Sequence, residues 1–139
     1  MIRCNTVANA AELGVDGLIV SNHGGRNLDS ARSSLEVLPE VAKAAGDRAI
    51  IILDSGIRRG SDIVKAVALG AKAVLTGRAT LYGTAAGGEA GAAHAIALLK
   101  SELDKTMAYE GCCTIDEIGP DILAAPQRPE TRDALLEPV

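Results

Sequence analysis

Three short apolar runs, each followed by a polar turn that contains glycine, limit what this chain can fold into. The runs span residues 17–20, 49–53 and 73–75, and each is continuously apolar rather than alternating. Runs of this kind are typical of parallel strands that are covered on both faces. The turns that follow them are Ser21-Asn22-His23-Gly24-Gly25, Asp54-Ser55-Gly56 and Thr76-Gly77-Arg78. We therefore expect three buried parallel strands that place polar loops at their carboxyl ends.

Helix signals fill the segments between the runs. A helix over about residues 5–13 would end at Gly14, and a second would carry Pro39 in its first turn and end at Gly46. Ser61 is the expected N-cap of a third helix over 62–69. The longest helix is expected over about residues 89–109, with an apolar stripe at three- and four-residue spacing made by Ile96, Leu99, Leu103 and Met107.

This alternation of strands and helices predicts an α/β fold with parallel strands and right-handed crossovers. The pattern leaves two architectures open, an open doubly wound sheet and an arc of a (β/α)8 barrel. In both architectures ligands bind at the carboxyl ends of the strands. The polar turns of this chain lie at those ends.

Composition narrows the class of protein. The 139 residues, 47% of them apolar, suffice for one domain with a real core. A net charge of −4, with Tyr82 and Tyr109 as the sole aromatic residues, argues against a nucleic-acid partner. The chain has three cysteines, Cys4, Cys112 and Cys113, an odd number without the spacing of a zinc site. We therefore expect reduced thiols and no metal. No signal core and no membrane-spanning run occurs, which favours a cytoplasmic protein.

The polar turn after the first run carries the groups of an acid–base site. His23 follows the strand directly, and an imidazole can take or give a proton near neutral pH. Gly24 and Gly25 allow the backbone to approach a ligand closely. Arg26 can hold a carboxylate through two parallel hydrogen bonds. An ordinary loop with a solvated histidine and arginine is the alternative, and this short run alone fits both.

The other two turns predict a phosphate site. Residues 54–60 lead from a strand through glycine into a helix start, and glycine turns with free helix N–H groups bind phosphate. Arg58 or Arg59 adds positive charge, and Gly77 with Arg78 repeats the arrangement after the next strand. A pair of ordinary turns with solvated arginines is the alternative. Two successive loops of this kind favour the phosphate site, which many barrels form after their last two strands.

The segment Gly14-Val15-Asp16-Gly17-Leu18-Ile19-Val20-Ser21-Asn22-His23-Gly24-Gly25-Arg26 resembles the signature of the FMN-dependent α-hydroxy-acid dehydrogenases and oxidases. Residues 53–60 and 76–78 resemble that family's two flavin-phosphate segments. Residues 69–71, 77–83 and 111–115 are most similar to its L-lactate dehydrogenase and mandelate dehydrogenase branch. The resemblance runs from near Met1 to about Leu123 and implies strands six to eight of a (β/α)8 TIM barrel. Residues 1–125 would then form the C-terminal portion of the barrel, and 126–139 a flexible tail.

The resemblance also implies a function. FMN would be the cofactor, and a small L-2-hydroxy acid of the lactate or mandelate type would be oxidised to the 2-oxo acid. His23 would remove a proton from the substrate, and Arg26 would pair with its carboxylate. The implied flavin contacts are Ser21, Asp54, Ser55, Gly56, Ile57, Arg58, Gly77 and Arg78. The complete protein is expected to be a homo-oligomer, whereas its electron acceptor and any membrane association through an upstream segment stay open.

The chain also departs from the family pattern. The flavin-facing lysine at the end of strand five would fall just before Met1, and strands one to five are not in the sequence. We therefore expect the isolated chain to be inactive, with Ile19, Ile51 and Leu75 facing the place of those strands. Two alternatives remain: a non-catalytic or inactive truncated fragment, or another FMN- or phosphate-binding barrel, such as a type 2 isopentenyl-diphosphate isomerase or an inosine-monophosphate dehydrogenase relative. The run from Asn22 to Arg26 argues against the other barrels.

Overall fold

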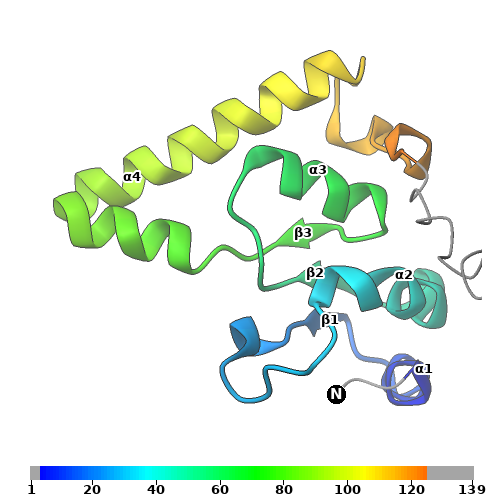
Figure 1. Ribbon diagram of the computed structural model, residues 1–139. Helices are drawn as coiled ribbons and strands as arrows, with labels where there is room; N and C mark the ends of the chain where they lie inside the picture. The colour runs from blue at the N-terminus through cyan, green and yellow to red at the C-terminus, as the bar shows by residue number, and fades with distance from the viewer. Residues whose placement is uncertain (1–3, 125–139) are drawn as a thin grey trace, which may run out of the picture.

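A computed structural model describes residues 4–124 of the chain. It is an α/β structure in which strands and helices alternate along the sequence (Figure 1). The three strands are β1 (Gly17–Val20), β2 (Ile50–Leu53) and β3 (Ala73–Val74). The four α-helices are α1 (Cys4–Glu12), α2 (Ser34–Ala45), α3 (Gly60–Ala68) and α4 (Arg78–Tyr109). Four short 3-10 turns, η1 to η4, span His23–Gly25, Gly46–Arg48, Ile115–Glu117 and Pro120–Ile122.

The three predicted strands form one parallel sheet in the order β1-β2-β3. Leu18 pairs with Ile51, and Val20 pairs with Leu53, so the two strands end side by side. The strand prediction is therefore confirmed, with ends that differ by one residue. Within the described residues β1 and β3 are the two edges of the sheet, because each pairs with β2 alone.

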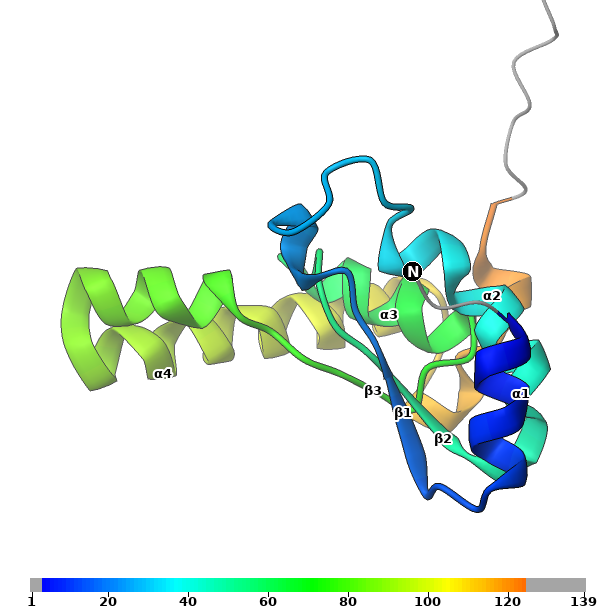
Figure 2. The ribbon, with the colours of Figure 1, turned by 90° about the horizontal axis from the view of Figure 1, so that it is seen from below.

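Helices α1, α2 and α3 cover one face of the sheet (Figure 2). Val20, Ile51 and Leu53 point into this layer and are almost fully buried, against Leu38 and Val41 of α2. Because side chains alternate along a strand, these residues share a face at a spacing of two.

The opposite face is bare in the described residues. Ile19 is 55% exposed and Leu75 is 43% exposed. The expectation that both faces are covered therefore holds for one face only. Ile51 is only 3% exposed, so its expected place on the bare face was wrong. The strand's two-residue period sends Ile51 to the helix side.

The start of α2 differs from the prediction. Ser33 is the N-cap, and it forms a capping box in which its side chain accepts from the Glu36 N–H while Glu36 Oε2 accepts from the Ser33 N–H at 2.9 Å. Pro39 therefore lies inside the helix rather than in its first turn. The reciprocal cap fixes the helix start further upstream than the proline suggested. Gly46 ends the helix, as predicted.

The start of α3 also differs from the prediction. The N-cap is Arg59, and the expected cap Ser61 lies within the helix. Asp62 Oδ2 accepts hydrogen bonds from the backbone N–H groups of Arg58 and Arg59, both at 3.0 Å. A carboxylate in the first turn thus performs the capping that had been assigned to the serine.

Helix α4 is two helical arms joined at Gly87 and Gly88. These glycines break the helix, and Gly88 has a φ of 58°. The two arms fold back on each other as a hairpin that extends away from the sheet (Figure 2). The predicted helix over 89–109 corresponds to the second arm, and the first arm was not predicted. Of its expected stripe, Leu99 and Met107 are buried, whereas Ile96 is 55% exposed.

No helix within residues 4–124 has the length and apolar character needed to cross a membrane. The tail predicted over 126–139 lies outside the described residues.

Candidate cofactor and substrate site

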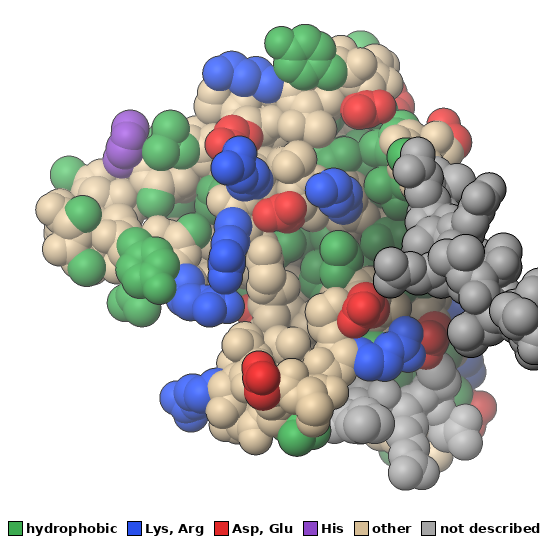
Figure 3. Space-filling model, in the orientation of Figure 1, with side chains coloured by type: hydrophobic (Ala, Val, Ile, Leu, Met, Phe, Trp, Pro, Cys, Tyr) green, Lys and Arg blue, Asp and Glu red, His purple; other side chains and the backbone are tan. Residues whose placement is uncertain are grey.

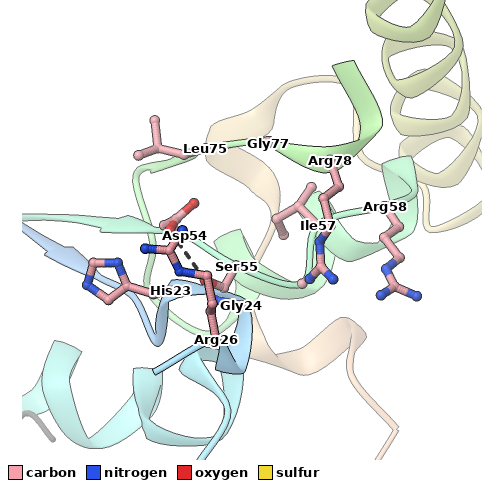
Figure 4. Close-up of a pocket in the computed structure, with 11 residues that line it drawn as sticks. His23, Gly24, Arg26, Asp54, Ser55, Ile57, Arg58, Leu75, Gly77 and Arg78 are labelled. Carbon is pink, nitrogen blue, oxygen red and sulfur yellow. Dashed lines mark hydrogen bonds between the residues drawn. The ribbon is translucent and has the colours of Figure 1, made fainter. Parts of the chain in front are cut away.

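The carboxyl ends of the three strands meet at a cavity of about 360 Å³. Figure 4 shows that its lining comes from the loops after β1, β2 and β3. Every predicted site residue except Ser21 lines this cavity, and Ser21 is hydrogen-bonded to one that does. Gly24, which was expected to let the backbone approach a ligand, also lines the cavity, whereas Leu75 was not expected there. A volume of this size falls within the usual range of small-ligand pockets, roughly 300–1,000 Å³.

The loop after β1 turns sharply to present His23. Three successive residues have positive φ, with values of 55° at His23, 68° at Gly24 and 77° at Gly25. Asn22 stabilises this turn because its Oδ1 accepts from the Gly24 N–H at 3.0 Å and its carbonyl accepts from the Gly25 N–H at 3.0 Å. His23 and Arg26 are both exposed, and both line the cavity.

The loop after β2 contacts the loop after β1 through polar side chains. Ser21 Oγ donates to Asp54 Oδ2 at 2.6 Å, and Ser55 Oγ donates to the same oxygen at 3.3 Å. The two hydroxyl oxygens lie 3.3 Å apart. Ser55 has a φ of 80°, which is unusual for a residue with a side chain.

The N-terminus of α3 is already occupied by carboxylates. Asp62 accepts from the N–H groups of Arg58 and Arg59, and Glu102 Oε2 of α4 accepts from the Gly60 N–H at 2.9 Å. The N–H groups of Arg58, Arg59 and Gly60 therefore have protein acceptors in this structure, and the assignment of this segment to phosphate stays a prediction. Negative side chains fill the position because the helix N-terminus attracts them.

The N-terminus of α4 has backbone N–H groups that are open to a ligand. Within the described chain, the N–H groups of Arg78, Ala79 and Thr80 have no protein acceptor. Such groups at a helix start are a ready-made anion site. Gly77 is the N-cap, and a Cβ added there would meet nothing within 4 Å, so a ligand has room to approach.

Two arginines add positive charge beside this helix start. The side chains of Arg58 and Arg78 extend side by side, on the opposite side of the cavity from His23 (Figure 4). Neither guanidinium forms an ion pair with another described residue. Arg78 also reaches the loop after β1, because a Cβ on Gly24 would lie 3.3 Å from its Nη2. Figure 3 shows basic side chains gathered on this face where α4 begins.

Sequence reasoning missed Glu102 and Asp62, which shape the site from outside it. Asp62 has a detectable signal, since an acidic residue three positions after an N-cap is the capping-box spacing. Glu102 has none, because it is 42 residues from its partner Gly60.

Parallel strands with glycine loops, paired arginines and a histidine at their carboxyl ends define an α/β protein that binds a phosphate-bearing ligand. Comparison with known proteins gives the family. Residues 2–125 match the family described as FMN-dependent dehydrogenase, and the chain belongs to this family, whose cofactor is FMN.

The chain is similar to several characterised members. It is 49% identical to an L-lactate oxidase of Nostoc sp. over 88% of this chain and 34% of that protein. It is 56% identical to the (S)-mandelate dehydrogenase of Pseudomonas putida over 79% of this chain and 28% of that protein. A crystal structure of the monotopic membrane protein (S)-mandelate dehydrogenase superposes with a TM-score of 0.84 at 49% identity, over 89% of this chain and 33% of that one. The chain thus spans about one third of these proteins.

Proposed function

We propose that this chain supplies strands six to eight of a (β/α)8 barrel that oxidises a small L-2-hydroxy acid to the 2-oxo acid with FMN. The relatives named above support the reaction class, since they include an L-lactate oxidase and an (S)-mandelate dehydrogenase. The observation that carries the proposal is the layout of one cavity. His23 and Arg26 line it together with Arg58 and Arg78, which lie across from His23.

The residues present fit the phosphate end of FMN. Arg58 and Arg78 supply charge, and Gly77 with the open N-terminus of α4 supplies N–H donors. Gly56 and Ile57 precede Arg58 in the same loop and line the same cavity, so we assign them to the flavin as well. When bound, FMN would take up the two electrons and one of the two protons that leave the substrate, and His23 would take the other proton.

The substrate end is assigned to the loop after β1. Arg26 pairs with the substrate carboxylate, because a guanidinium matches a carboxylate with two parallel hydrogen bonds. His23 accepts one proton from the hydroxyl-bearing carbon or its hydroxyl group, because a positioned imidazole is the commonest general base in enzyme sites. Asp54 and Ser55 line the cavity beside the histidine loop and Ser21 is hydrogen-bonded to Asp54, and all three are proposed to contact the flavin.

The test uses a hybrid barrel in which residues 2–125 of this chain replace the matching region of the Pseudomonas putida (S)-mandelate dehydrogenase. We expect a yellow protein whose flavin absorbance is bleached by L-lactate or (S)-mandelate without oxygen. A yellow protein that no 2-hydroxy acid bleaches would support another FMN-binding barrel. A folded protein without flavin would support a non-catalytic role.

A further inference from the structure

The loops after β1 and β2 are joined by a small polar cluster, which we call the serine bridge. It consists of Ser21, Asp54 and Ser55. Its members are 33 or 34 residues apart in sequence across the two loops, and the pairing of β1 with β2 brings them together. All three side chains are partly buried. The bridge lies at the base of the loop that carries His23.

The hydrogen bonds of the bridge all lead from Asp54 to the backbone of the histidine loop. Both serine hydroxyls donate to Asp54 Oδ2, Ser21 at 2.6 Å and Ser55 at 3.3 Å. Each hydroxyl oxygen then accepts from the loop: Ser21 Oγ from the His23 N–H and Ser55 Oγ from the Gly24 N–H, both at 3.1 Å. The carboxylate fixes the direction of both hydroxyls, because it can only accept. The serines therefore present their lone pairs to the two N–H groups that set the path of the loop. Figure 4 shows Asp54 and Ser55 directly beside Gly24 and His23.

Backbone strain is concentrated in the same place. His23 and Ser55 are the two residues other than glycine with positive φ among the described residues, at 55° and 80°. Glycine would adopt the conformation at position 55 without cost. The side chain retained there has one polar atom, and that atom contacts Gly24, Ser21 and Asp54. Strain that persists at a site is a reason to look for a function of the strained side chain.

We propose that Ser21, Asp54 and Ser55 are positioning residues for His23, acting through the backbone of its loop. This inference rests on the proposed function of His23. It goes beyond a role as flavin contacts, because the bridge would also set the geometry of the proton transfer. The loop is exposed on its other side, so the bridge and the Asn22 turn supply its anchoring.

Four variants of the hybrid barrel test the bridge: Ser21→Ala, Ser55→Ala, Ser55→Gly and the double change of both serines to alanine. Ser101→Ala is the control, since Ser101 is an exposed serine of α4 far along the chain from the site. Two quantities are measured for each, the dissociation constant of FMN and the rate constant of flavin reduction at saturating substrate across a range of pH.

We expect each single variant to slow flavin reduction by roughly 10- to 100-fold, because a small displacement of a reacting group is enough for such a loss. The rates are compared at saturating FMN, because Ser21 and Ser55 are also proposed to contact the flavin and their loss can lower FMN affinity without bearing on the loop. The double variant should be no slower than the slower single variant, because members of one hydrogen-bond network are not additive. Ser55→Gly should be as slow as Ser55→Ala, although it removes the backbone strain.

Three results would overturn the inference. One is a loss of FMN affinity with an unchanged reduction rate in the FMN-saturated protein, and another is additive losses in the double variant. The third is a Ser55→Gly protein that reduces FMN at the original rate, which would mean that the hydroxyl does nothing. If no 2-hydroxy acid reduces even the parent hybrid, the proposed function fails. In that case the melting temperatures of the same variants test whether the bridge exists. The bridge predicts that the shifts in melting temperature of the two single variants do not add up to the shift of the double variant.

Discussion

His23 stands at the edge of the cavity with its backbone held in a left-handed turn and its ring exposed. In the hybrid barrel, we expect His23→Ala to lower the rate of flavin reduction by at least roughly 100-fold, because the proton then has no acceptor at the substrate. FMN should remain bound, since Arg58 and Arg78, the proposed phosphate-binding residues, lie across the cavity from His23. Stopped-flow absorbance measures the reduction rate. Reduction at a near-normal rate would remove His23 from the mechanism.

The two ends of the cavity should respond differently to loss of an arginine. Arg26→Lys keeps the charge but loses the two-pronged donor, so substrate binding should weaken by ~1–3 kcal/mol while FMN affinity stays the same. Arg78→Ala should release FMN and leave the substrate anchor in place. Equilibrium dialysis of FMN and substrate titration separate the two effects. If both variants altered FMN affinity alone, Arg26 would not be the carboxylate anchor.

At the scale of elements, Gly60 controls how closely α3 and α4 approach. A Cβ at this position would overlap the backbone of Glu102 and Leu103. Gly60→Ala should therefore destabilise the hybrid barrel by ~1–3 kcal/mol or more, because neither backbone can move away cheaply. Urea unfolding measures the change. Gly87→Ala is the control, since a Cβ there meets nothing within 4 Å. Equal stability of the two variants would contradict this account of the helix contact.

Helix α2 should carry a pH-dependent cap. The N–H and hydroxyl of Ser33 lower the pKa of Glu36 below its ordinary value of 4.5 by hydrogen bonding to the carboxylate. A lowered folded-state pKa means that the stabilisation is complete above about pH 4.5 and is lost as the pH falls through the folded-state pKa. The stability difference between the parent and Glu36→Gln should thus be largest near neutral pH and shrink in acid. Glu89→Gln, at an exposed position, should give a flat difference. A flat difference for Glu36→Gln as well would contradict the cap.

The elements were predictable to the extent that their signals are local. Apolar runs ended by glycine located β1, β2 and β3, and Gly46 located the end of α2. Pro39 and Ser61 gave wrong helix starts because each segment contains more than one start signal. The signal that sets the start is Ser33 in α2 and Asp62 in α3. The first arm of α4 was missed because it is rich in glycine and alanine and has no apolar stripe.

The site was predictable by resemblance, but its internal contacts were not. Of the ten site residues predicted from the sequence motifs, nine line one cavity in the structure. The hydrogen bonds of the serine bridge depend on the register between β1 and β2, which no single motif specifies. The contact of Glu102 with Gly60 depends on how α4 packs on α3, far along the chain. Local sequence therefore identifies the groups, whereas their partners come from the tertiary arrangement.

At the scale of the molecule, we expect the 139-residue chain alone to be neither a stable monomer nor active. Within residues 4–124 the sheet has two unpaired edges, β1 and β3, and a bare face where Ile19 and Leu75 are exposed. Burying one such side chain is worth roughly 1.5–3 kcal/mol. Several such losses rival the ~5–15 kcal/mol by which a domain is stable.

Size-exclusion chromatography, circular dichroism and a flavin spectrum of the chain test this expectation. We expect oligomers or aggregates without yellow colour, and recovery of both solubility and colour when the N-terminal part of a related barrel is added. A sharp monomer peak with cooperative melting and stoichiometric FMN would mean that these residues fold and bind the cofactor unaided.

The unequal helix starts also bear on where the protein can hold the flavin phosphate. Of the two helix starts beside the cavity, that of α3 is capped by Asp62 and Glu102, whereas that of α4 has backbone N–H groups without a partner among the described residues. A mononucleotide carries one terminal phosphate, which a single open helix start can hold. Acidic capping of α3 therefore leaves α4 as the helix start at which we expect the phosphate of a mononucleotide to be held.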